Sequence, residues 1–98
     1  MLQFEELRLK LQGMEPELRE LKQSLNIDKL GIEIAELERK AAEPSFWDDM
    51  ENSQNVMQKI GSLKAKVASY EGVKNDYDDA LVMIELANEE EDADLLYD

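Results

Sequence analysis

The octapeptide EPSFWDDM, residues 43–50, decides where this chain reverses direction. Because a proline pushes the residue before it out of the helical region, Pro44 must end any helix that arrives at Glu43. Asp48 or Asp49 can then cap a new helix by accepting hydrogen bonds from its first free amides. Acidic side chains also suit the positive end of the new helix dipole. We therefore predict a tight turn between two helices.

The same octapeptide holds the only tryptophan of the chain, Trp47, beside Phe46, one of two phenylalanines. Two adjacent rings in a short interhelical turn favour a structural plug, in which both fold back and bury ~150 to 250 Å² each against the end of the helices. The alternative is a site for a ligand or partner. We predict that Phe46 and Trp47 form a plug.

The sequence on both sides of the turn predicts helices that pack as in a coiled coil. Apolar residues recur alternately three and four positions apart, which places them on one stripe of a helix. Strand patterns and internal repeats are absent from the sequence. The stripes predict helices over about 3–24, 28–42 and 50–87.

Local signals refine these helices. Pro16 removes one helical amide, but the stripe keeps its phase across it, so we predict a kink without a break. Asn26 or Asp28 can cap the second helix. After the third helix, the acidic run EEEDAD, residues 89–94, is expected to be a frayed connector, and LLYD, residues 95–98, to begin a further helix.

These elements predict an all-α fold, an elongated antiparallel three-helix bundle that forms a single domain over residues 1–98. Two shorter helices folded as a hairpin would cover only the first part of the third, to about Tyr70. A bare apolar stripe would remain, and such patches usually mark contact surfaces. Two shorter helices lying end to end along the third would instead cover it. The candidate contact surface comprises Val73, Tyr77, Leu81 and Ile84.

The charge of the chain restricts its partners. The chain contains 11 basic and 24 acidic side chains, which gives a net charge of -13. Residues 75–98 contain ten acidic residues and no basic one. This balance repels nucleic-acid phosphates and anionic membranes and favours a basic protein partner. The start of the chain lacks the apolar core of a signal peptide, and no run approaches the ~18 apolar residues of a membrane span. We expect a cytoplasmic protein.

The residue types needed for most chemistry are missing. The chain contains no histidine and no cysteine, so the usual general bases and activated nucleophiles are absent. Asp76, Asp78 and Asp79 resemble the start of a calcium loop, but Ala80 and Leu81 stand where a ligand and a glycine are required. The four glycines are scattered singly, so none forms a phosphate-binding loop. We expect no catalysis, no cofactor and no metal.

Several segments in order resemble one known family across nearly the whole chain. The Phe-Trp-acid turn is the most specific of them, and Met50 departs from the proline that the family commonly has there. These segments resemble the N-terminal domain of bacterial peptide chain release factor 2, a class I translation termination factor. They are SLNIDKL at 24–30, IAELERK at 34–40, EPSFWDD at 43–49 and IELANEEEDADLL at 84–96.

The resemblance implies the first domain of a longer factor that directs termination at UGA and UAA codons on the ribosome. Family members carry a catalytic Gly-Gly-Gln and a codon-reading Ser-Pro-Phe in later domains, and neither tripeptide occurs here. The implied role is docking at the large-subunit stalk base, as a monomer attached to the remaining domains. Two alternatives need no resemblance: an acidic helical adaptor or coiled-coil interaction module, and a carboxylate-based metal-dependent hydrolase.

Overall fold

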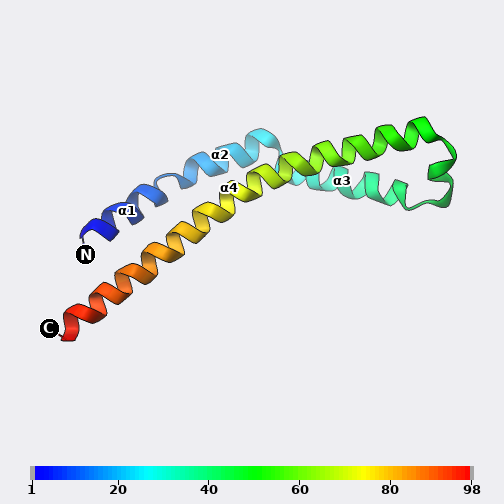
Figure 1. Ribbon diagram of the computed structural model, residues 1–98. Helices are drawn as coiled ribbons and strands as arrows, with labels where there is room; N and C mark the ends of the chain where they lie inside the picture. The colour runs from blue at the N-terminus through cyan, green and yellow to red at the C-terminus, as the bar shows by residue number, and fades with distance from the viewer. Residues whose placement is uncertain (1, 98) are drawn as a thin grey trace. The chain divides into compact units, whose positions relative to one another are not determined.

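The computed structural model describes the backbone of residues 2–97 and the side chains of residues 3–91. Within these residues the chain forms only helices and short connections, so the predicted all-α class is confirmed. The elements, labelled in Figure 1, are α1 (Leu2–Gln12), α2 (Glu15–Leu25), α3 (Ile27–Ala41), the 3-10 helix η1 (Pro44–Asp48) and α4 (Met50–Tyr97).

The first predicted helix is two helices, so the expected kink at Pro16 is wrong. The last α-helical hydrogen bond of α1 is donated by the amide of Gly13 to the carbonyl of Leu9, at 2.9 Å. The amide of Met14 then donates to the carbonyl of Leu11, also at 2.9 Å, which closes a tighter turn. A proline has no amide to donate, and it is best tolerated in the first turn of a helix. The chain therefore restarts at Glu15 and places Pro16 in that first turn.

Asn26 separates α2 from α3 through its backbone and not through its side chain. Its φ of 53° and ψ of 49° are left-handed, a conformation that asparagine tolerates better than most residues. The side chain makes no capping hydrogen bond, although Asn26 does occupy the N-cap position. The predicted second helix is otherwise recovered, because α3 ends at Ala41 and η1 begins at Pro44.

The predicted connector over residues 89–94 and the further helix after it are wrong. α4 continues without interruption from Met50 to Tyr97, past the expected end at residue 87. The acidic run has no glycine or proline to stop a helix, and glutamate and alanine are strong helix formers. The side chains of this run beyond residue 91 lie outside the described residues.

The chain divides into two compact units, and the expected three-helix bundle is not confirmed in either. The turn unit, residues 22–71, contains α3, η1 and the first part of α4, with α3 and α4 running in opposite directions on the two sides of η1 (Figure 1). Lys59 pairs with Glu33 at 3.3 Å, and Lys64 with Glu38 at 2.6 Å. Among residues 3–91, whose side chains are described, the buried apolar residues are all in this unit: Ile27, Phe46, Ile60, Leu63 and Tyr70.

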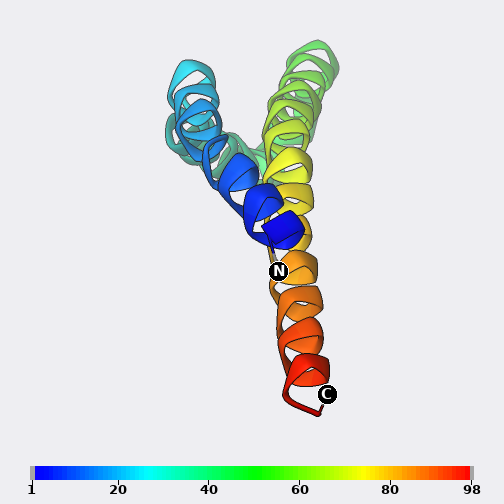
Figure 2. The same cartoon turned by 90° about the vertical axis from the view of Figure 1, so that its left-hand side faces the viewer.

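The terminal unit consists of residues 1–21 and 72–98. Here α1 lies beside the later part of α4, as both ribbon views show (Figures 1 and 2). No described side chain of this unit is fully buried. Each unit thus pairs a different part of α4 with a different preceding helix.

Candidate interaction surfaces

The two aromatic residues of the turn lie in different environments. Phe46 is 8% exposed, and its amide donates to the carbonyl of Glu43 at 3.0 Å. The Trp47 ring meets the Phe46 ring edge to face, at 90° with 5.0 Å between centroids, but remains 57% exposed. The predicted burial of Trp47 is therefore wrong. In a 3-10 helix, with three residues per turn, adjacent side chains point in different directions, so Phe46 and Trp47 do not both face the interior.

The start of α4 next to these rings is fixed by several hydrogen bonds. The carboxylate of Asp49 accepts from the amide of Asn52 at 3.1 Å, which confirms Asp49 as the cap. Ser53 is 1% exposed, and its hydroxyl donates to the carbonyl of Met50 at 2.9 Å. The Met50 side chain remains 66% exposed. An exposed methionine thus stands on an ordered backbone, three residues after an exposed tryptophan.

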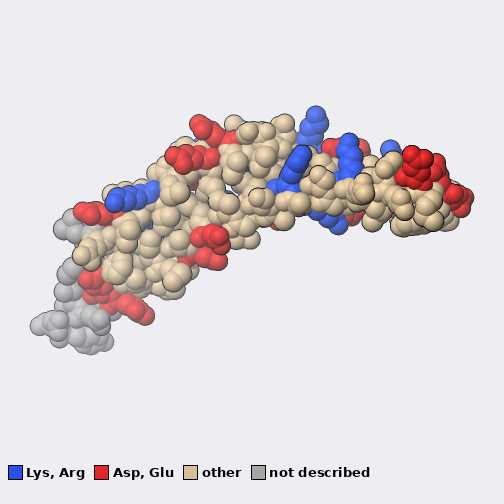
Figure 3. All heavy atoms as spheres, turned by 45° about the horizontal axis from the view of Figure 1, so that its top comes forward, with Lys and Arg blue, Asp and Glu red and all other residues tan. Residues whose placement is uncertain are grey.

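Acidic residues flank Trp47 and Met50 along the chain. Figure 3 shows red side chains gathered at the end of the turn unit where η1 meets α4. From Lys40 to Lys59 the intervening sequence contains no basic residue. The acidic residues in that interval are Glu43, Asp48, Asp49 and Glu51, all of them exposed.

The candidate stripe on α4 lies in the terminal unit, and it is not bare. Leu11, Met14 and Leu18 face it and enclose a groove of about 250 Å³, whose other wall is built by Val73, Asp76, Tyr77 and Ala80. The expectation that the preceding helices cover α4 only to Tyr70 is therefore wrong, because α1 and α2 supply side chains beyond that point.

The coverage of the stripe is incomplete. Val73 is 48% exposed, whereas Tyr77, Leu81 and Ile84 are half-buried. The hydroxyl of Tyr77 is buried without a hydrogen-bond partner. Lys74 lies 5.9 Å from the centre of the Tyr77 ring and binds both carboxylate oxygens of Asp78 at 2.8 Å. The stripe thus helps to hold the unit together, and any role of these four residues as a contact surface stays a prediction.

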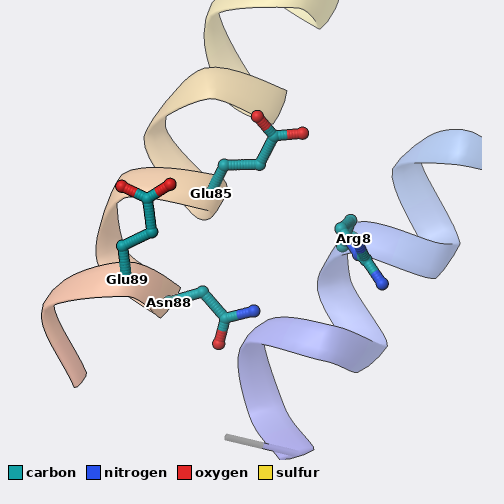
Figure 4. A pocket seen from close by; sticks show the side chains of 4 residues that line it. All are labelled: Arg8, Glu85, Asn88 and Glu89. Carbon is teal, nitrogen blue, oxygen red and sulfur yellow. The ribbon is translucent and has the colours of Figure 1, made fainter. Parts of the chain in front are cut away.

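A second, polar hollow of about 200 Å³ lies between α1 and α4, lined by Arg8, Glu85, Asn88 and Glu89 (Figure 4). Glu5 accepts a hydrogen bond from Asn88 at 2.8 Å and another from Arg8 at 2.6 Å. The Nε of Arg8 is buried without a partner. Sequence reasoning missed these residues, because their spacing along the chain carries no signal that they meet.

Comparison with known proteins supplies the family. Residues 30–97 match the PCRF domain, and this match includes the turn and almost all of α3 and α4. This chain belongs to the PCRF domain family. Together with the relatives named below, this match confirms the resemblance of the chain to release factor 2.

Curated relatives of this PCRF domain carry the name peptide chain release factor 2. The protein from an Exiguobacterium species is 35% identical over 94 residues, which are 96% of this chain and 26% of the relative. The proteins from Streptomyces avermitilis and Acidothermus cellulolyticus are 38% and 37% identical, over 86% and 84% of this chain. The chain spans about a quarter of the length of these relatives. No solved structure matches it significantly.

The described part of this PCRF domain offers no grouping for metal chemistry. Among those residues, no three His, Cys, Asp or Glu side chains are placed to hold one ion. None of the described helices combines the length and the apolar character that a membrane crossing requires. What the geometry does offer is two exposed apolar side chains at the turn, Trp47 and Met50, and a half-covered apolar stripe.

Proposed function

We propose that this chain is a docking and positioning domain of a peptide chain release factor, which directs translation termination at UGA and UAA codons on the ribosome. The observation that carries the proposal is the PCRF match over residues 30–97 together with the 35% identity to a release factor 2 over 96% of the chain. In this proposal the chain is the first domain of a longer cytoplasmic factor.

The proposed role is binding without catalysis. The chain contains neither a histidine nor a cysteine, and it lacks the Gly-Gly-Gln and Ser-Pro-Phe tripeptides that the resemblance assigns to peptide release and codon reading. The remaining domains of the factor would perform those two tasks. This chain would set the position of those domains by holding the large subunit at its stalk base.

The proposed ribosomal contact is with protein. A domain with a net charge of -13 is repelled by phosphates at long range, so its affinity for naked RNA is expected to be low. Isolated lysines such as Lys59, Lys64 and Lys66 still permit local phosphate contacts. Two of them already pair with carboxylates of α3.

A purified termination system tests the proposal. The isolated chain should bind ribosomes as a monomer and compete weakly with a complete release factor, while causing no stop-codon-dependent hydrolysis of peptidyl-tRNA. Hydrolysis by the chain alone would overturn the division of tasks, and absence of ribosome binding would overturn the docking role. A mass that rises with concentration would instead favour the coiled-coil interaction module.

A further inference from the structure

The exposed pair at the turn has the properties of a binding anchor. Trp47 is 57% exposed and Met50 is 66% exposed, although burial of a large apolar side chain usually stabilises the folded state. Tryptophan is among the residues most enriched at the energetic centres of protein interfaces. Methionine adapts to irregular apolar surfaces, because it is unbranched and polarisable.

The surrounding structure holds the Trp47 ring and the backbone of Met50 in place before any partner arrives. The Trp47 ring rests against the edge of buried Phe46, 5.0 Å between centroids. Met50 begins α4, where the Ser53 hydroxyl bonds its carbonyl and Asp49 caps the helix. Because the Trp47 ring already packs against Phe46, it loses less conformational entropy on binding, and more of its contact energy appears as affinity.

The charges around the pair select the kind of partner. Four exposed carboxylates stand within nine residues of chain, and no basic side chain offsets them between Lys40 and Lys59. Tryptophan can also stack on nucleic-acid bases, but such sites lie in positively charged grooves that attract the backbone. An anionic lipid surface is disfavoured for the same electrostatic reason. A partner that matches both the apolar side chains and the negative charge is a protein with an apolar pocket rimmed by lysine and arginine.

We propose that Trp47 and Met50 are the anchor by which this domain docks into an apolar, basic-rimmed pocket on a protein of the large ribosomal subunit. This inference rests on the proposed docking function and names the residues and the partner chemistry that the function needs. Trp47 enters the pocket, Met50 packs against its wall, and the carboxylates of Glu43, Asp48 and Glu51 meet the basic rim.

Binding of variants to purified large ribosomal subunits, measured by cosedimentation, tests the anchor. Trp47→Ala should weaken binding at least about tenfold, because anchor residues dominate interface energetics. Asp48→Lys should weaken it by a smaller factor and reduce its salt dependence. Ile32→Ala is the matched control, since Ile32 is 63% exposed on α3 and outside the turn. It should bind like the unsubstituted chain.

Oxidative footprinting of the complex gives a direct and independent measurement. On addition of subunits, oxidation of Trp47 and Met50 should fall, whereas oxidation of Met83, which is 69% exposed on α4, should not. Circular dichroism of each variant confirms that it is folded before binding is compared.

The outcomes separate the two proposals. If the unsubstituted chain does not bind subunits at all, the docking function fails and this inference fails with it. If the unsubstituted chain binds but Trp47→Ala binds equally well, or if Met83 is protected and Met50 is not, only the anchor is overturned. Equal affinity for naked ribosomal RNA and for intact subunits would overturn the protein pocket as partner.

Discussion

Asn88 of α4 and Glu5 of α1, 83 positions apart in the chain, are joined by a hydrogen bond of 2.8 Å. The second carboxylate oxygen of Glu5 accepts from Arg8 at 2.6 Å. No described side chain of α1 is fully buried, so apolar burial holds this helix only weakly. Because Arg8 also lies on α1, only the bond to Asn88, of these two, joins this helix to α4, and loss of the Glu5 carboxylate should therefore loosen α1.

Replacement of Glu5 by alanine should release α1 without unfolding the turn unit. The substitution removes both hydrogen bonds of the carboxylate, with an expected net loss of ~1 kcal/mol. Amide hydrogen exchange in α1 should then become roughly fivefold faster, because local opening costs less free energy. Glu6→Ala is the control, since Glu6 is exposed and adjacent. Unchanged exchange in α1 of the Glu5 variant would contradict the proposed importance of this carboxylate.

Substitutions of the two turn aromatics should have unequal effects on stability. Phe46 is 8% exposed, so Phe46→Ala should lower the free energy of unfolding by roughly 3 to 5 kcal/mol, or unfold the turn unit altogether. Trp47 is 57% exposed, so Trp47→Ala should lower it by less than ~1 kcal/mol. Urea denaturation followed by circular dichroism measures both. Equal losses would show that both rings plug the turn, as the sequence alone suggested.

The intrinsic fluorescence of the folded chain should report an exposed indole. Trp47 is the only tryptophan, so the signal belongs to one residue. At 57% exposure its emission maximum should lie close to that of tryptophan in water, and acrylamide should quench it readily. Denaturation should change the emission wavelength little. A blue-shifted native emission that moves to the red on unfolding would place the ring in the interior.

The helices of this chain could be predicted because their signals are local. Pro44 ends a helix by steric contact with its neighbour, and Asp49 caps the next one from three residues away. The break at Gly13 and Met14 was misread, because an apolar stripe continues in phase whether or not the backbone hydrogen bonds do. The spacing of apolar residues indicates which side chains share a helix face, but not whether the helix is continuous.

The partners of each helix could not be predicted, because the apolar stripes share one spacing. A stripe with three-four alternation packs equally well against any other such stripe, so the pattern does not say which part of α4 meets Leu11 or Leu18. The exposure of Trp47 was missed for a related reason. Two adjacent rings in one turn look alike in sequence, and only the turn geometry decides which of them enters the interior.

Gly72 and Gly13 should respond differently to alanine. Gly72 lies within α4 with no atom within 4 Å of the position that a Cβ would take, and its φ is not positive. Alanine there removes conformational freedom from the unfolded chain without a clash, so Gly72→Ala should stabilise the protein by roughly 0.5 to 1 kcal/mol. The thermal midpoint should rise by a few degrees.

At Gly13 a Cβ would lie 3.3 Å from the carbonyl oxygens of both Leu9 and Lys10, where α1 ends. Those backbone atoms cannot move aside without disturbing the last turn of α1, so Gly13→Ala should leave the thermal midpoint unchanged or lower it. The quantity to compare is the difference in thermal midpoint between the two variants, because both replace glycine by alanine. A fall in the midpoint of Gly72→Ala would show that α4 approaches another part of the chain or a second copy at that position. A rise in Gly13→Ala would show that α1 and α2 can join into the continuous helix that their shared stripe suggests.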